Sequence, residues 1–200
     1  MLEKRNFYIN GKWRTPSKAN DFEVINPSNE EPFAIISLGY EKDTDAAVKA
    51  AKNAFIQWKE TSKEERIDLL ENLLTIYKKR FKEMTEAISM EMGAPMDWSS
   101  SAQTTSGQSH LEDFIFRLKD FNFEGHFDSK SNNHISYEPI GVCGLITPWN
   151  WPINQIALKV VPALATGCTM ILKPSEIAPI SAMLFAEMID EAGFPSGVFN

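Results

Sequence analysis

The segment 141–200 alternates short apolar runs with longer helical patterns, and this alternation limits the possible folds more than any other feature of the chain. The expected elements are a strand, a helix, a strand, a helix and the start of a strand, at 141–146, 152–166, 168–172, 179–192 and from Gly197. Strands that alternate with helices form parallel sheets with right-handed crossovers. The sequence therefore predicts an α/β fold with a parallel sheet.

Polar side chains directly follow the first two of these strands. The run Ile-Thr-Pro-Trp-Asn-Trp-Pro at 146–152 places Asn150 in a strand-to-helix turn, and the second strand ends in Lys-Pro-Ser-Glu at 173–176. Ligands of open α/β sheets bind at the carboxyl ends of the strands. We therefore expect both turns to contribute to one ligand site. The alternative is that both are ordinary surface loops.

The segment before residue 121 is expected to be a hairpin, two strands and a series of helices. Asn10-Gly11 tolerates positive φ at both positions and predicts a two-residue hairpin turn. Ser62 and Glu65 form a capping box at the start of a helix. The expected strands are 7–9, 12–14, 22–25 and 33–36. One helix is expected to begin at Asp43 and a second at Ser62. A third is expected to cover 82–92 and to end at Gly93, and a fourth to cover 98–119.

The segments 121–127 and 135–138 are expected to pair as two strands joined by the polar loop 128–133. A long two-stranded ribbon is marginally stable alone in water, so a partner surface is physically sensible. A local surface hairpin without a partner remains an equal alternative.

Composition excludes several classes of protein. There are 27 acidic and 20 basic residues, which argues against a nucleic-acid partner. No apolar run is long enough to span a bilayer and no signal-peptide pattern opens the chain, so a cytoplasmic protein is expected. The two cysteines, Cys143 and Cys168, lie in apolar strands and are expected to be buried free thiols. The three histidines lack the spacing of metal ligands, and no metal site is expected.

Five separated motifs resemble the aldehyde dehydrogenase superfamily, in the order of that family. They are Glu-Met-Gly-Ala-Pro at 91–95, the turn at 146–152, Ala-Leu-Ala-Thr-Gly-Cys at 163–168, Lys-Pro-Ser-Glu at 173–176 and the segment 191–200. The resemblance runs from about Phe7 to Asn200. It implies a variant Rossmann-like sheet without an early G-x-G-x-x-G motif, which is absent here as well.

The resemblance also implies a division of the chain. Residues 1–120 would pack on the cofactor domain, 121–140 would form a protruding hairpin that pairs with a neighbouring subunit, and 141–200 would begin the NAD(P)-binding domain. The complete protein would then be a homo-dimer or homo-tetramer. The family's nucleophilic cysteine, general-base glutamate and glycine-rich pyrophosphate turn would lie beyond Asn200. The chain is expected to be an amino-terminal portion of such an enzyme.

By resemblance, the cofactor is held at the two strand ends. Lys173 and Glu176 would contact the adenosine ribose, with charge-assisted hydrogen bonds. Glu176 would repel a 2′-phosphate, so NAD is favoured and NADP is possible. Ser175 joins this group, and the four residues Ile146, Thr147, Pro148 and Trp149 would shape the cofactor cleft. The alternative is an exposed Lys–Glu pair of little consequence.

The resemblance gives Asn150 the catalytic role in this segment. Its amide would stabilise the oxyanion formed when a thiolate attacks the aldehyde carbon. Trp151, Gln155 and Leu158 fall at i, i+4 and i+7 on one helix face, which the resemblance places along the passage for the aldehyde. The alternatives are an ordinary turn asparagine at 150 and, on the helix, two of these three side chains as ordinary core residues, Leu158 above all.

The expected function is NAD(P)-dependent oxidation of an aldehyde to a carboxylic acid through a covalent thiohemiacetal and thioester. A non-catalytic relative that keeps nucleotide binding or the oligomer surface is the alternative. Burial raises the pKa of thiols, so neither Cys143 nor Cys168 is expected to act as the nucleophile. Residues 1–200 alone are expected to be inactive, and an interrupted sheet edge is expected to promote aggregation.

Overall fold

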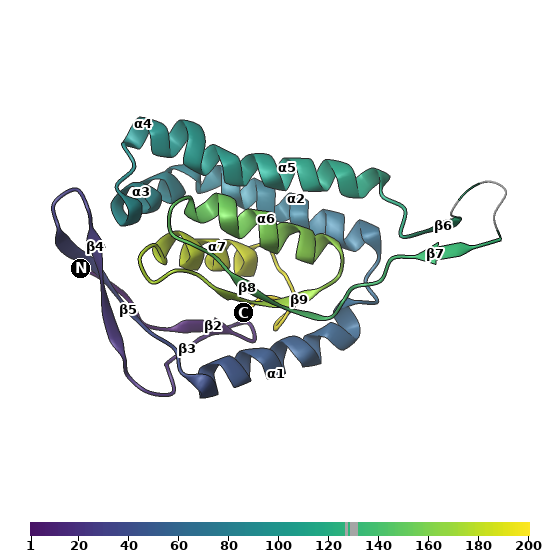
Figure 1. Cartoon of the computed structure of the whole chain (residues 1–200), viewed down its shortest axis with the longest axis horizontal. Helices are drawn as coiled ribbons and strands as arrows, with labels where there is room; N and C mark the ends of the chain where they lie inside the picture. The colour runs from purple at the N-terminus through teal and green to yellow at the C-terminus, as the bar shows by residue number, and fades with distance from the viewer. Residues whose placement is uncertain (127, 129–131) are drawn as a thin grey trace.

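The computed structural model describes residues 1–126, 128 and 132–200, and it is a mixed α/β fold (Figure 1). The strands are β1 (Leu2–Lys4), β2 (Phe7–Ile9), β3 (Lys12–Arg14), β4 (Asp21–Asn26), β5 (Glu31–Ser37), β6 (Glu124–His126), β7 (His134–Ser136), β8 (Val142–Ile146) and β9 (Thr169–Lys173). The helices are α1 (Glu41–Trp58), α2 (Lys63–Lys79), α3 (Phe81–Met92), α4 (Met96–Trp98), the π-helix η1 (Ser99–Thr104), α5 (Thr105–Asp120), α6 (Pro152–Ala165) and α7 (Ile180–Glu191).

The predicted parallel sheet is present in the carboxyl-terminal segment. β8 and β9 pair in parallel from Val142 opposite Thr169 to Ile146 opposite Lys173. On the other side of β9, Phe199 forms a parallel bridge with Met170. The strand expected from Gly197 is therefore reduced to one bridge. The α/β prediction is confirmed, and the pairing is what a partial Rossmann-like sheet requires.

Helices cover these strands on both sides. Figure 1 shows α1 on one side of β8 and β9, with α6 and α7 on the other. The Trp58 indole N–H of α1 donates to the Cys168 carbonyl at 3.1 Å, and the Thr169 hydroxyl donates to the Ala51 carbonyl at 3.0 Å. α6 is apolar on most of its circumference and is buried among α2, α5 and α7, as a crossover helix over a covered sheet should be.

The predicted hairpin and helix caps at the amino-terminal end are confirmed. β2 and β3 pair antiparallel around Asn10 and Gly11, whose φ angles are 55° and 70°. The Ser62 side chain accepts from the Glu65 N–H, and Gly93 ends α3 with a φ of 75°. Strand β1 was not predicted; it pairs in parallel with β5 in a sheet of order β1-β5-β4.

One expected helix, 98–119, is wrong as a single regular helix. The chain forms the short α4, then one wider π-helical stretch at Ser99–Thr104, and only then α5. Hydroxyl groups compete for the backbone carbonyls here, since the side chains of Ser101 and Thr105 donate to the carbonyls of Asp97 and Ser100. Such local bonds disturb the regular α-helical ladder.

The hairpin after α5 is shorter than predicted. Among the described residues three of each strand pair, Glu124–His126 with His134–Ser136, where we expected 121–127 and 135–138. The rings of Phe121 and Phe123 instead pack edge-on with their centroids 4.9 Å apart, and the centroid of Phe121 lies 5.4 Å from that of Tyr137. Residues 127 and 129–131 of the predicted strand and loop lie outside the described residues. Figure 1 shows the ribbon standing away from the body.

A buried carboxylate joins α3 to the start of α7. Glu91 is 1% exposed and accepts hydrogen bonds from the backbone N–H groups of Ile180 and Ser181, the latter at 3.2 Å. These are among the N–H groups that a helix start leaves without an intrahelical partner. Burial raises the pKa of Glu91 from its ordinary 4.5 to about 7, although the backbone donors act in the opposite direction.

This raised pKa predicts a pH-dependent stability. The folded protein holds a proton on Glu91 more tightly than the unfolded chain does, so the contribution of Glu91 to stability falls as pH rises from about 4.5 to about 7. Glu91→Gln keeps an acceptor but cannot ionise. We expect the free energy of unfolding of wild type, relative to Glu91→Gln, to fall by up to about 3 kcal/mol over this range. Urea denaturation at several pH values measures it, and parallel curves for the two proteins would contradict it.

Candidate functional site

The two polar turns leave the sheet at the same edge. Ile146 and Lys173 are the last register pair of β8 and β9, and the Thr147 N–H donates to the Lys173 carbonyl at 3.3 Å. The structure therefore brings the residues after both strands together, as the parallel topology requires.

The turn after β9 carries an ion pair. The Lys173 ammonium lies 3.1 Å from the Glu176 carboxylate, and both side chains remain substantially exposed. The N–H of Glu176 itself, followed by the Lys173 charge, holds the pKa of Glu176 below its usual value. The Ser175 hydroxyl accepts from the Ile177 N–H at 3.2 Å and so tightens the turn before α7. Glu176 is thus held as a carboxylate at the surface of the strand end.

A groove of about 720 Å³ runs past this turn. Four of the predicted cofactor residues line it, namely Ile146, Lys173, Ser175 and Glu176. Its other walls come from β2, β5, α1 and α7 and are largely apolar. This size falls in the usual range for small-molecule sites. The sequence offered no signal for the amino-terminal contribution, because those strands lie more than a hundred residues from Lys173.

Three predicted cofactor residues do not line the groove. Thr147 is 4% exposed, and its hydroxyl oxygen has no hydrogen-bond partner within the described residues. Pro148 and Trp149 are exposed beside it. These residues form the backbone of the turn between the groove and Asn150.

Asn150 lies exposed in this turn, and across the described part of the chain its side chain has no hydrogen bond. The alternative of a turn asparagine that bonds its own backbone therefore finds no support. The turn is anchored on both sides, by Thr147 on the sheet and by Trp151, whose indole N–H donates to the Ser106 hydroxyl at 3.2 Å. Because the turn is anchored and the Asn150 amide has no partner among the described residues, its N–H can donate to a ligand oxygen.

The three predicted substrate-passage residues follow on α6. Trp151 is half-buried at the helix start, and the Gln155 side-chain oxygen accepts from the Lys159 ammonium at 3.4 Å. Leu158 is 41% exposed and so lies outside the core of the described residues.

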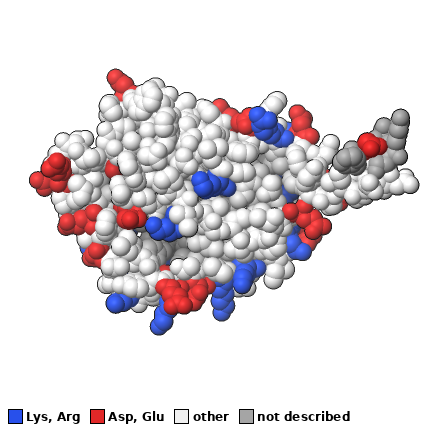
Figure 2. Space-filling view, viewed as in Figure 1, with Lys and Arg blue, Asp and Glu red and all other residues white. Residues whose placement is uncertain are grey.

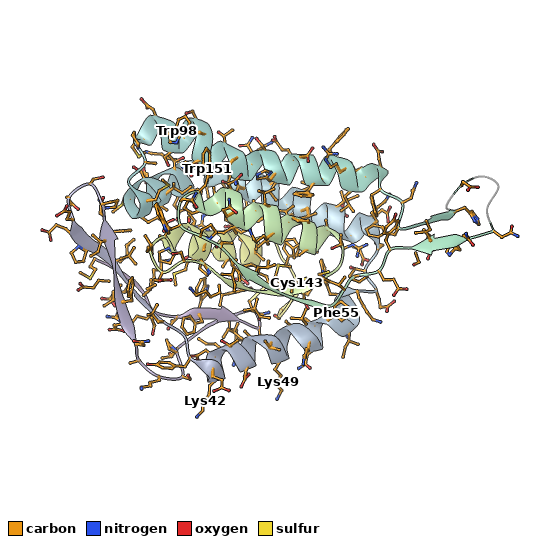
Figure 3. The ribbon with its side chains drawn as sticks, viewed as in Figure 1. Lys42, Lys49, Phe55, Trp98, Cys143 and Trp151 are labelled. Atoms are coloured by element: carbon orange, nitrogen blue, oxygen red, sulfur yellow. The ribbon has the colours of Figure 1, made fainter. Side chains whose placement is uncertain are left out.

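Sequence reasoning missed the residues that α4 and α5 bring to this helix. Trp98 meets Trp151 nearly edge-on, with ring centroids 6.1 Å apart (Figure 3). The His110 Nε2 atom lies 2.7 Å from the Asn154 side-chain oxygen and links α5 to α6. Both contacts join segments about fifty residues apart and depend on how helices pack against each other. A local sequence pattern therefore cannot predict them.

The cysteines are placed for packing. Cys143 lies on β8 and is half-buried (Figure 3), and Cys168 is buried before β9. Burial, and then the neighbouring Cys168, raise the pKa of the Cys143 thiol to about 11. A thiol with such a pKa holds almost no thiolate at neutral pH, so Cys143 is a poor nucleophile.

Other features of the described residues bear on ligand class. No group of three or more His, Cys, Asp and Glu side chains among them is arranged to hold a metal ion. In the same residues no helix is long and apolar enough to cross a membrane. Figure 2 shows Lys and Arg interspersed with Asp and Glu on the face in view.

Comparisons with known proteins agree with the motifs. The family model described as Aldehyde dehydrogenase family matches residues 13–200. A 3-succinoylsemialdehyde-pyridine dehydrogenase of a Pseudomonas species is 49% identical over 201 residues, which cover 100% of this chain and 42% of that protein.

Two solved structures are also similar. An aldehyde dehydrogenase from Bartonella henselae superposes with a TM-score of 0.98 at 57% identity, covering 100% of this chain and 42% of that one. Aldehyde dehydrogenase C of Pseudomonas syringae, solved with NAD+ and octanal, gives a TM-score of 0.94 at 42% identity over 98% of this chain and 40% of that one. The chain thus spans about two fifths of the length of these relatives.

Proposed function

Because this chain belongs to the aldehyde dehydrogenase family, we propose that the full-length protein oxidises an aldehyde to a carboxylic acid with NAD as the hydride acceptor. The observation that carries the proposal is the shared strand edge, where Ile146 pairs with Lys173 and both polar turns emerge together. One turn offers an ion pair suited to ribose hydroxyls, and the other offers the uncommitted amide of Asn150.

The residues of the second turn fit the adenosine ribose of NAD. The Glu176 carboxylate can accept from the ribose hydroxyls while the Lys173 ammonium donates to them, and these charge-assisted bonds are the stronger kind. The groove beside them has room for a nucleoside. Ile146 and the backbone of 147–149 would shape the cleft, with Ser175 holding the turn. NAD is favoured over NADP, because Glu176 is ionised where a 2′-phosphate would lie.

Two substitutions test this arrangement. Glu176→Gln removes the repelling charge, so we expect the NADP-to-NAD affinity ratio to rise roughly tenfold, as for charges separated by a few ångströms near water. Lys173→Ala should weaken both cofactors. Fluorescence titration of the full-length protein with each cofactor measures both effects. The control is Glu60→Gln, an exposed change in the turn that follows α1. An unchanged ratio in Glu176→Gln would mean that this carboxylate does not face the ribose.

At the first turn we propose that Asn150 donates its amide N–H to the aldehyde oxygen. A thiolate attack on the carbonyl carbon gives a tetrahedral thiohemiacetal with negative charge on that oxygen, and a positioned donor stabilises it. NAD, when bound, would supply the acceptor for the hydride that leaves this adduct. Loss of the hydride would leave a thioester, and water would cleave that thioester to the carboxylic acid and the free thiol. Trp151, Gln155 and Leu158 would line the approach of the aldehyde along α6.

The nucleophile is proposed to come from outside residues 1–200. The raised pKa of Cys143 and the burial of Cys168 argue against both thiols in this segment. A cysteine and a general-base glutamate in the rest of the protein would complete the reaction. Both cysteines here are free, which fits the proposed location in the reducing cytoplasm.

We also propose that 121–140 mediates assembly into a homo-dimer or homo-tetramer, with 1–120 packed on a cofactor domain that begins at 141. Support comes from the projecting ribbon (Figure 1) and from apolar side chains exposed along it, Phe121, Tyr137 and Ile140. An isolated two-stranded ribbon is marginal in water, and a second copy would cover it.

The experiment that tests the proposed function is direct. The full-length protein is mixed with NAD and a panel of aliphatic and aromatic aldehydes, and NADH formation is followed by absorbance. Aldehyde-dependent NADH formation is the expected result. NAD binding without any turnover across the panel would favour the non-catalytic alternative.

A further inference from the structure

Two histidines face each other across the projecting hairpin. His126 of β6 and His134 of β7 are direct register partners. The Tyr137 N–H donates to the Phe123 carbonyl at 2.8 Å, which makes that pair a hydrogen-bonded one. Hydrogen-bonded and non-hydrogen-bonded pairs alternate along an antiparallel ladder. His126 and His134 lie three rungs further on and therefore form a non-hydrogen-bonded pair, the kind in which the side chains are closest.

The two imidazole rings lie close together and are accessible to solvent. Their centroids are 5.8 Å apart with an interplanar angle of 70°, and both side chains are exposed. Glu124 lies on the same face of the ribbon, two residues before His126, and one of its carboxylate oxygens is 3.8 Å from Nε2 of His134. Two imidazoles and a negative charge are thus gathered on one face, at the end of the ribbon that Figure 1 shows away from the body.

We propose that His126 and His134 form a two-histidine clip for a divalent late transition-metal ion such as Cu²⁺, Ni²⁺ or Zn²⁺. Neutral imidazole is a good ligand for these ions, and Cu²⁺ should bind most tightly of the three. The Glu124 carboxylate increases the local attraction for a cation. Within the described residues no third side chain completes a ligand group, so water or a second copy of the chain supplies the remaining positions.

Such an ion would stabilise the strand pairing itself. It bridges β6 and β7 only while the two histidines remain in register, so it binds the paired ribbon in preference to the open one. The three-residue ladder of β6 and β7 is short enough for this to matter.

The test compares three histidine variants of the full-length protein, prepared without an affinity tag and stripped of metal with a chelator. Calorimetric titration with CuCl₂, NiCl₂ and ZnCl₂ is carried out on wild type, His126→Ala, His134→Ala and His110→Ala. Loss of one arm of a chelating pair removes the effective-concentration advantage, so the first two variants should bind the clip ion roughly 10²-fold more weakly. His110→Ala is the matched control, because that ring contacts Asn154 on the body and should leave the affinity unchanged.

Amide hydrogen exchange gives a second readout. Saturating metal should slow exchange in β6 and β7 of the wild-type protein and of His110→Ala, and should leave it unchanged in the other two variants. Equal affinities in all four proteins would overturn the proposal, and so would metal binding without added protection of β6 and β7. In either case the pair would be a ring contact only.

Discussion

Full-length enzyme carrying Asn150→Ala is expected to turn over its aldehyde roughly 10²–10³-fold more slowly than wild type at saturating substrate, as for loss of one oxyanion donor. The expectation follows from the geometry of the strand-end turn. Asn150 is exposed next to the anchored Thr147 and Trp151, and its amide is uncommitted within the described residues. Since the donor acts on charge that develops during the reaction, kcat should fall far more than the affinity for NAD.

Steady-state kinetics and a parallel NAD titration separate these effects. Asn53→Ala, an exposed asparagine change on α1, is the matched control and should keep the wild-type kcat. A wild-type kcat in Asn150→Ala would remove this residue from the mechanism. A loss of NAD affinity as large as the loss of kcat would show that the turn positions the cofactor instead.

The largest structural effect is expected for Trp58→Ala, which should lower the free energy of unfolding by about 3–5 kcal/mol. Trp58 is 2% exposed at the end of α1 and packs edge-on against Phe194 at 5.9 Å. Its indole N–H donates to the Cys168 carbonyl at the start of β9. Truncation opens a cavity beneath the sheet and leaves that carbonyl without the indole donor.

Two further variants on α1 locate the cause. Trp58→Phe keeps most of the ring and loses the donor, so a smaller cost of about 1–2 kcal/mol is expected. Ile56→Ala changes an exposed side chain and should stay within about 0.5 kcal/mol of wild type. Urea denaturation followed by circular dichroism measures all three without relying on tryptophan fluorescence. Equal stability of Trp58→Ala and wild type would contradict the packing described for α1 on β9.

The sequence predicted the parts of the fold that local patterns encode. The apolar runs of β8 and β9, the Asn10-Gly11 turn and the Ser62 capping box each lie within a few residues, and each is present in the structure. It failed where longer-range contacts decide. β1 is a mostly exposed Leu-Glu-Lys strand, and its own three residues carry no sign of the distant partner β5 with which it pairs. The serine-rich start of the expected helix 98–119 has a helical pattern, but side-chain hydroxyls bond to its backbone carbonyls and the segment forms the π-helix η1.

The candidate site likewise has features that the sequence could predict and features that depend on long-range packing. That Ile146 and Lys173 end at one edge follows from parallel topology, so it could be predicted. That Trp98 rests on Trp151 depends on how α4 and α6 meet, and no spacing in the sequence encodes it. The walls that β2, β5 and α1 add to the groove were missed for the same reason.

We propose that the two strand-end turns hold the cofactor and face the carbonyl of the aldehyde. A crystal structure of the full-length protein with NAD and a slowly reacting aldehyde tests this most directly. We expect the adenosine ribose within hydrogen-bond distance of Glu176 and Lys173, and the aldehyde oxygen within hydrogen-bond distance of the Asn150 amide. A ribose bound elsewhere in the groove, with Lys173 and Glu176 still paired only to each other, would contradict it.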